Sequence, residues 1–182
     1  ALETMLENRI IMNKLVIDVA NEKIFLMIIT KDDIYNITKE NTKINYEKLT
    51  LILKDFLKSK SLKGGFDIIY DPIGDCYTEP AFRSIGWKGR YLVVGFAAGQ
   101  IPKLPINLSL LKGASLVGVF WGSFTGREPD LNTKNLNEIN QMLKNGEIKP
   151  LVSKTFPMER AVEAINLIGN RGAIGKVVLI NE

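Results

Sequence analysis

The stretch FDIIYDPIGDCYTEPAFRSIGWKGRYLVVGF, residues 66–96, contains two nearly continuous apolar runs, separated by a polar loop and a short amphipathic segment. The first run ends at Asp71 and Pro72, and the second ends at Gly95 and Phe96. Runs that do not alternate apolar and polar residues are typical of parallel strands with helices on both faces. The stretch therefore predicts two neighbouring parallel strands joined by a helical crossover.

The same alternation of β-rich and helix-period runs continues along the chain and predicts an α/β fold, a Rossmann-like doubly wound parallel sheet. Apolar residues at helical spacing predict helices over Leu49 to Phe56 and over Leu136 to Leu143. A third helix begins at Pro157, and its Ala161, Ile165 and Ile168 are expected to face inward. Strands are expected at residues 23–29, 43–46, 66–70, 90–95, 114–120, 151–156 and 176–180.

The composition limits the chemistry that this sequence can perform. It has 182 residues, 46% of them hydrophobic, which suffices for one ordinary globular domain. Cys76 is its single cysteine, so no internal disulfide can form, and a lone cysteine is typically a small buried apolar group. Because the sequence contains no histidine, it offers no zinc site and no Ser-His-Asp or Cys-His nucleophile.

Charge and hydropathy indicate which partners and which compartment to expect. The formal net charge is +4, but lysines are scattered among nearly as many acids, and only residues 54–63 are mildly basic. We expect that segment to be a solvated helix face, and without an aromatic and basic platform nucleic acid is not an expected partner. No apolar run approaches the roughly 20 residues that span a bilayer. We therefore expect a soluble protein of a reducing compartment, cytoplasmic or mitochondrial.

The ends of the two central strands are the expected ligand site. In a doubly wound sheet the ligand lies beyond the carboxyl ends of the strands. The loop after Asp71, which contains Gly74, and the loop at Gly95 and Phe96 should therefore border one crevice. Gly95 could let a ligand ring approach the backbone, although glycine at a strand end is as often simply a turn. Hydride transfer from a nicotinamide demands little of protein acids, so a crevice without histidine suits it.

Residues 64–124 and 146–180 resemble the C-terminal, nucleotide-binding portion of zinc-free quinone oxidoreductases. These are relatives of zeta-crystallin within the medium-chain dehydrogenase/reductase superfamily. Upstream, KINYEKL at 43–49 resembles the family's strand-end Ile-Asn-Tyr, and KIFLMIITKDD at 23–33 resembles its second nucleotide-domain strand. The resemblance implies NADPH as cofactor and, in the complete enzyme, hydride transfer to a quinone or enone.

The resemblance also implies which residues bind the cofactor. Thr30 and Lys31 stand where the family holds the adenosine ribose and its 2′-phosphate, and a lysine there favours NADPH over NADH. Tyr46 resembles the family tyrosine near the adenosine phosphate. No catalytic residue and no metal ligand is assigned. The segments that resemble those lining the nicotinamide and its ribose contain Asp71, Gly74, Gly95, Phe96, Phe120 and Trp121.

The resemblance further implies an assembly and a domain organisation. The strand at 114–120 resembles the edge strand through which family members pair, so we expect a homodimer. Residues 1–22 form an atypical N-terminal segment, and residues 23–150 form a partial NADP-binding Rossmann-like domain. In the family, the helix and strand of residues 151–182 return to a catalytic domain that this sequence does not contain.

Two departures from the family pattern bear on function. The family's Gly-rich phosphate turn has no counterpart, because residues 3–21 contain no glycine, and backbone amides then cannot come close around a pyrophosphate. The first strand before that turn is expected to be missing as well, which would leave the sheet without its central strand. The domain that forms much of the family's quinone pocket is also absent, so a full catalytic site is not expected in this chain alone.

Three interpretations therefore remain open. The chain is the nucleotide-binding half of an NADPH-dependent quinone oxidoreductase-like protein, or it is a catalytically inactive truncated remnant that acts as a binding or dimerisation module. A methyltransferase-like α/β domain is a third interpretation. It also requires a glycine-rich first turn, so it matches the sequence less well.

Overall fold

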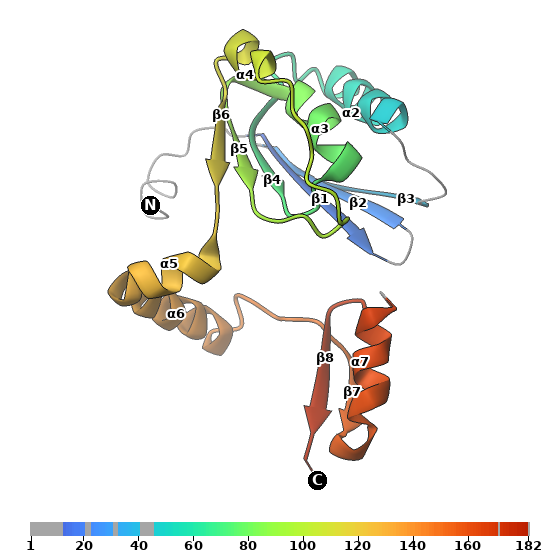
Figure 1. Ribbon diagram of the computed structural model, residues 1–182, viewed down its shortest axis with the longest axis vertical. Helices are drawn as coiled ribbons and strands as arrows, with labels where there is room; N and C mark the ends of the chain where they lie inside the picture. Colours follow the sequence, from blue (N-terminus) through green and yellow to red (C-terminus); the bar gives the residue numbers. More distant parts are fainter. Residues whose placement is uncertain (1–12, 21–22, 31–32, 41–45, 171, 182) are drawn as a thin grey trace. The chain divides into compact units, whose positions relative to one another are not determined.

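A computed structural model describes residues 13–20, 23–30, 33–40, 46–170 and 172–181 of the chain. The chain divides into two compact units, Ala1–Val119 and Phe120–Glu182. Each unit has its own β-sheet, with six strands in the first and two in the second among the described residues (Figure 1).

The first unit carries a six-stranded sheet whose strand order is β3-β2-β1-β4-β5-β6. This is the order of a Rossmann sheet, so the predicted Rossmann-like α/β fold is confirmed. Its strands are β1 (Lys14–Ala20), β2 (Lys23–Ile29), β3 (Ile34–Glu40), β4 (Phe66–Asp71), β5 (Ile85–Val93) and β6 (Ser115–Gly118). Its helical elements are α2 (Tyr46–Ser59), η1 (Asp75–Tyr77), α3 (Thr78–Arg83) and α4 (Asn107–Lys112).

The directions of the strands differ from a fully parallel sheet at one position. β1, β4, β5 and β6 pair in parallel, whereas β2 is antiparallel to both β1 and β3. Only two residues, Asn21 and Glu22, separate β1 from β2. A parallel connection needs about a dozen residues or more, so this short link makes β2 run back along β1.

The expectation that the central strand is missing is wrong. Lys14–Ala20 occupies the place between β2 and β4, with Leu15 beside Ile69 of β4 in parallel register. Leu15 and Ile17, two residues apart, are both fully buried. Their period-two spacing lets this segment bury one face while its backbone pairs with β4, whose amides would otherwise lack partners.

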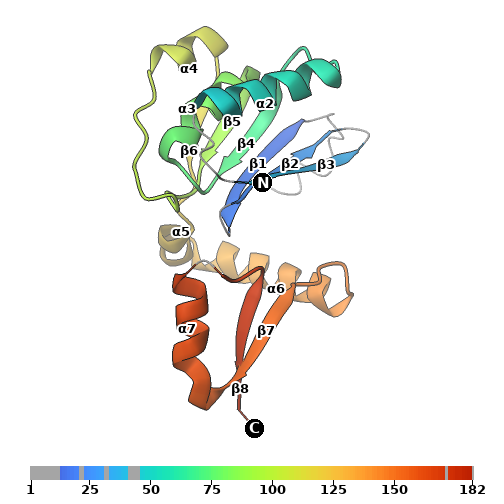
Figure 2. The ribbon, with the colours of Figure 1, turned by 90° about the vertical axis from the view of Figure 1, so that its right-hand side faces the viewer.

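Helices of the first unit cover one face of its sheet. Figure 1 and Figure 2 show α2 and α3 on the same face. There the predicted stripe of α2, which includes Leu49, Leu53 and Phe56, is buried in the same core as the strand residues. On the opposite face Met27 and Tyr70 are 41% and 40% exposed. The short connections from β1 to β2 and from β2 to β3 leave no length for helices there.

Several predicted boundaries shift. Tyr46 begins α2 rather than ending a strand, and residues 43–45 lie outside the described part of the chain. A helix forms here because its apolar stripe is buried in the core cluster that also contains residues of β1, β2 and β4. β5 begins at Ile85, before the predicted start, and ends at Val93.

The second unit contains α5 (Trp121–Arg127), α6 (Pro129–Lys144), β7 (Val152–Pro157), η2 (Met158–Arg160), α7 (Ala161–Gly169) and β8 (Lys176–Ile180). β7 and β8 pair in parallel, with α7 between them in sequence. The expectation that Ile165 and Ile168 face inward is wrong, because they are 66% and 56% exposed, while Ala164 is 3% exposed. A two-stranded sheet covers only a narrow side of α7, and that side is centred on Ala164.

Nothing among the described helices is both long enough and apolar enough to span a lipid bilayer.

Candidate cofactor-binding site

Two loops meet at the carboxyl ends of β4 and β5, as the sequence predicts. We call residues 71–74 and 94–98 the loop pair. Main-chain hydrogen bonds hold them together, so the pair behaves as a short continuation of the sheet. The amides of Val94 and Gly95 donate to the carbonyl of Asp71 (3.0 and 3.4 Å), Ala97 donates to Pro72 (3.0 Å), and Ala98 donates to Ile73 (3.0 Å).

The carboxylate of Asp71 organises the first loop. The side chain is buried and accepts four hydrogen bonds. Its Oδ1 accepts the amides of Ile73 and Gly74, both at 2.9 Å. Its Oδ2 accepts the hydroxyls of Thr78 at 2.9 Å and Tyr91 at 2.6 Å. With both oxygens occupied, Asp71 acts on a ligand only through the loop that it positions.

Tyr91 was not singled out by the sequence, although a tyrosine within a buried strand needs a partner for its hydroxyl. Its ring is fully buried beside Phe82, with the ring centroids 5.5 Å apart. Burial raises the pKa of Tyr91 far above its usual value. The neighbouring Asp71 carboxylate, which accepts a hydrogen bond from the Tyr91 hydroxyl, raises this pKa further. The phenol therefore stays protonated as the fixed donor to Asp71.

This raised pKa predicts a loss of stability at alkaline pH. Below pH 10, roughly the tyrosine pKa in an unfolded chain, Tyr91 is protonated in both states. Above that pH only the unfolded chain releases the proton, so stability falls by about 1.4 kcal/mol per pH unit from this group. In urea unfolding from pH 9 to 11, about one unit either side of the unfolded pKa, we expect Tyr91→Phe to reduce the fall of the unfolding free energy with pH by that amount. Tyr70→Phe, in the same sheet, is the control, and equal slopes in both variants would contradict the assignment.

Two glycines allow the loops to pack closely. Gly74 has a φ of 72°, and a Cβ there would lie 2.7 Å from Cδ1 of Phe96. A Cβ on Gly95 would lie 3.2 Å from the carbonyl oxygen of Pro72. Phe96 itself is 40% exposed, so part of its ring is open to a ligand beside the loop pair.

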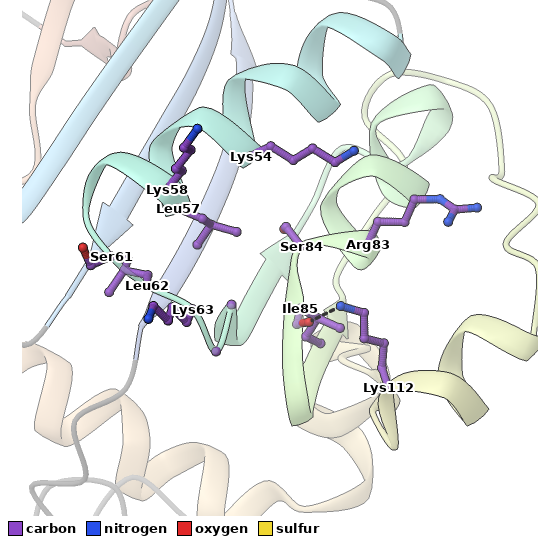
Figure 3. A pocket seen from close by; sticks show the side chains of 12 residues that line it. Lys54, Leu57, Lys58, Ser61, Leu62, Lys63, Arg83, Ser84, Ile85 and Lys112 are labelled. Atoms are coloured by element: carbon purple, nitrogen blue, oxygen red, sulfur yellow. Dashed lines mark hydrogen bonds between the residues drawn. The ribbon is translucent and has the colours of Figure 1, made fainter.

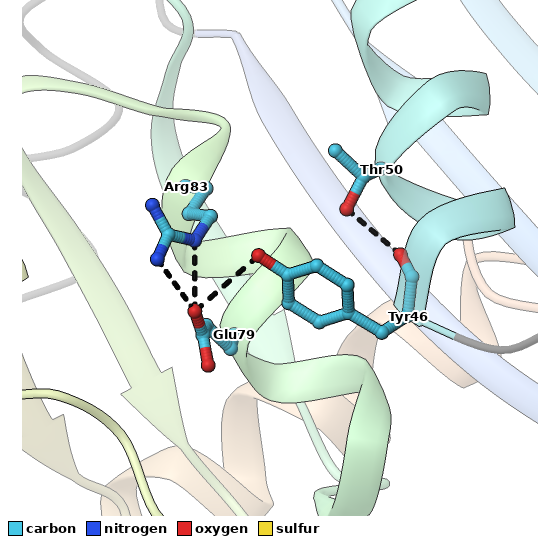
Figure 4. A network of polar contacts seen from close by, with 4 residues as sticks. All are labelled: Tyr46, Thr50, Glu79 and Arg83. Atoms are coloured by element: carbon cyan, nitrogen blue, oxygen red, sulfur yellow. Dashed lines mark hydrogen bonds and ion pairs between the residues drawn. The ribbon is translucent and has the colours of Figure 1, made fainter.

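Tyr46 lies at the same edge of the sheet. Its hydroxyl donates to Oε1 of Glu79 in the first turn of α3, at 3.3 Å (Figure 4). The same oxygen accepts Nε of Arg83 at 2.8 Å and pairs with Nη2 at 2.7 Å. The hydroxyl of Thr50 donates to the Tyr46 carbonyl at 2.8 Å. The network ties the start of α2 to α3, beside the first loop.

Of the remaining predicted cofactor residues, Thr30 is not brought to the loop pair. Thr30 follows the reversed strand β2, so it lies at the edge where β4 begins rather than where it ends. Lys31 lies outside the described residues. Phe120 and Trp121 open the second unit and are 78% and 52% exposed. The reversal of β2 could not be read from the strand pattern, because it depends on the two-residue connection.

No group of three or more potential His, Cys, Asp or Glu ligands occurs among the described residues, and the sequence contains no histidine. Cys76, expected to be buried, is instead exposed. Partial desolvation and the neighbouring Asp75 raise the pKa of its thiol, so the reactive thiolate is disfavoured.

The strand order and the paired loops at the carboxyl edge define a Rossmann-like domain. The chain belongs to the zinc-binding dehydrogenase family, whose model matches residues 42–179. It is 33% identical over 128 residues to a quinone oxidoreductase-like protein 2 homolog of Nematostella vectensis, covering 70% of this chain and 35% of that protein. The chain thus spans about a third of that relative's length.

Solved structures show the same fold. A native mycobacterial quinone oxidoreductase matches with a TM-score of 0.63 and 19% identity, covering 76% of this chain and 41% of its own. A mycobacterial protein complexed with NADPH matches with a TM-score of 0.61 and 19% identity, over 76% and 40% of the two chains. At 19% sequence identity these two matches show a shared fold only.

Proposed function

We propose that this chain is the nucleotide-binding half of an NADPH-dependent quinone oxidoreductase-like protein. The loop pair at the carboxyl ends of β4 and β5 is the observation that carries the proposal. Two loops joined by main-chain hydrogen bonds, with Gly74 and Gly95 at their closest approach, offer a rigid edge for a nicotinamide and its ribose. The nicotinamide would supply the hydride, and a quinone or enone would accept it.

The roles of this chain's own residues follow from their positions. Asp71 would hold the first loop in shape, and Phe96 would shield one face of the bound ring from water. Tyr46 would lie near the adenosine phosphate at the start of α2. Lys31, Phe120 and Trp121 remain proposed cofactor residues through the family resemblance alone, whereas Thr30 lies at the opposite edge of the sheet. Groups that complete a quinone pocket would have to come from residues beyond this chain.

A second candidate function has its own observation in favour. β1 is joined to β2 by two residues, and the first glycine of the sequence is Gly64. The usual pyrophosphate cradle, a glycine-rich turn leading into a helix N-terminus, therefore does not fit the described residues. The chain would then serve as a binding or dimerisation module. In either case we place a second copy at the edge strand β6, whose four residues are all exposed.

Titration with NADPH and NADH separates the two candidates. A ligand that binds only the native state at 100 times its Kd adds about 2.7 kcal/mol of stability. For a chain of this size that raises the thermal midpoint by roughly 5–10 °C. We expect saturable binding with NADPH favoured, and we expect Gly95→Val to weaken it at least about tenfold, because its side chain would push the loops apart.

Gly126→Val is the matched control, since a Cβ at Gly126 meets nothing within 4 Å and Gly126 lies outside the proposed dimer strand. No midpoint shift in a chain that unfolds cooperatively would favour the binding module instead. Sedimentation equilibrium of the same samples reports the proposed dimer, and a monomer at all concentrations would rule that out. The single cysteine is in keeping with a reducing compartment, cytoplasmic or mitochondrial.

A further inference from the structure

A pocket of about 350 Å³ lies in the first unit at the edge of the sheet where β4 and β5 begin. Gly64, Gly65 and Ile85 line it, and these residues directly precede or begin the two strands. The loop pair lies at the opposite ends of the same strands. Figure 3 shows the lining side chains around the space between α2, the segment before β4 and the start of β5. The pocket is therefore separate from the proposed cofactor site.

The pocket is lined by five cationic side chains. None of its lining residues is acidic within the part of the chain that the structure describes. The cations come from four places: the last two turns of α2, the segment before β4, α3 and the end of α4. Cations around a concave site give it a positive potential. In Figure 3 the ammonium groups of Lys54 and Lys112 lie beside the space, whereas the tips of Lys58 and Lys63 point outward. The five residues are Lys54, Lys58, Lys63, Arg83 and Lys112.

Most of this charge is not neutralised by the protein. Arg83 is paired with Glu79, which lies outside the pocket lining. Lys54, Lys58 and Lys63 have no carboxylate partner among the described residues. Lys54 and Lys58 are also four residues apart on α2, a spacing at which like charges destabilise a helix. An anion in the pocket would relieve this repulsion.

Stabilisation of the end of α2 does not account for these lysines. Carbonyls of its last turn already accept hydrogen bonds from the protein itself. Phe56 accepts the Lys60 amide at 3.0 Å and the Ser59 hydroxyl at 2.8 Å, and Leu57 accepts the Leu62 amide at 2.9 Å. The lysine ammonium groups are thus not needed to satisfy these carbonyls, and they remain available to a ligand.

One cation is held in place. Nζ of Lys112 donates to the carbonyl oxygen of Ile85 at 3.1 Å, which anchors this side chain from α4 against the start of β5 (Figure 3). An ammonium group has three donors, so two remain for a ligand. Leu57, Leu62 and Ile85 add apolar surface to the lining. The pocket therefore offers a preorganised donor, several adaptable cations and an apolar wall.

We propose that this pocket binds a small organic anion that carries at least two phosphate groups. Several cations spread over four elements match several phosphate oxygens better than they match one carboxylate. The volume lies within the range of small-molecule sites. Among the described residues no aromatic side chain lines the pocket to stack a base, so a small anion fits better than a single-stranded nucleic acid.

Isothermal titration calorimetry with inorganic triphosphate at physiological ionic strength tests the proposal. We expect one saturable site per chain, and we expect Lys54→Glu/Lys58→Glu to weaken binding at least about tenfold. The control Lys103→Glu/Lys144→Glu changes the net charge equally but alters no lining residue, and we expect it to bind as the unaltered chain does. Lys54→Gln/Lys58→Gln repeats the test without introducing negative charge, should the first variant fail to fold.

Three results would overturn the proposal. One is the absence of saturable triphosphate binding by the folded chain. Another is equal weakening in the pocket and control variants, which would indicate a nonspecific charge effect. The third is binding of a single-stranded oligonucleotide without saturable triphosphate binding, which would assign the surface to nucleic acid. Unchanged NADPH titrations in the Lys54→Gln/Lys58→Gln variant would keep this test independent of the proposed cofactor site.

Discussion

Replacing Asp71 by alanine is expected to lower the free energy of unfolding by about 3–5 kcal/mol, which is near the upper end for single substitutions. The carboxylate accepts two backbone amides and two hydroxyls at 2.6 to 2.9 Å in a buried site. Alanine would leave all four donors without this acceptor, including the fully buried hydroxyl of Tyr91. Urea unfolding followed by circular dichroism measures the loss.

Two comparison variants make the reason for that loss testable. Asp71→Asn keeps an acceptor for the two amides, and the hydroxyls of Thr78 and Tyr91 can rotate to accept from its NH₂ group. We expect it to cost about 1–2 kcal/mol, less than alanine. Asp55→Ala removes an exposed carboxylate from α2 and should change stability by less than about 0.5 kcal/mol. If Asp71→Ala were as mild as Asp55→Ala, the carboxylate would not organise the loop.

Gly74→Val is expected to cost about 2–3 kcal/mol and to disturb the proposed cofactor site at the same time. Gly74 has a φ of 72°, which a β-branched residue adopts only with strain. Its Cβ would also start 2.7 Å from Cδ1 of Phe96, so the partly exposed ring must move away. Thermal unfolding and NADPH titration of the same variant measure the two effects.

Gly74→Ala separates backbone strain from the extra bulk of valine. With a φ of 72° and a ψ of −144°, Gly74 has a backbone conformation that essentially only glycine adopts, so any Cβ is strained there and also meets Phe96. We expect Gly74→Ala to keep most of the stability loss of Gly74→Val and to weaken cofactor binding as well. Gly126→Val, whose Cβ would meet nothing within 4 Å, should leave both measurements unchanged. An alanine variant as stable as the unaltered chain would show that backbone strain at Gly74 is not the cause.

Local patterns were sufficient for four strands of the six-stranded sheet, β2, β4, β5 and β6, and for the neighbouring loops, but they missed β1 and β3. The apolar runs at Phe66 and Tyr91 predicted β4 and β5, and Asp71 with Gly95 marked where these strands end. These features could be predicted because strand pairing in a parallel α/β unit follows from the order of the elements. The role of Asp71 as an acceptor for Thr78 and Tyr91 could not, because these residues lie seven and twenty positions away.

The sequence by itself determined the α/β class, the family likeness and the absence of histidine chemistry, because each depends on residue type and local order. Only the tertiary structure decided that Lys14–Ala20 becomes the central strand and that β2 runs backward. It also decided that Thr30 lies at the far edge and that five cations from four elements surround one pocket. The physical reason is that strand direction depends on connection length, and charge convergence depends on packing between segments distant in sequence.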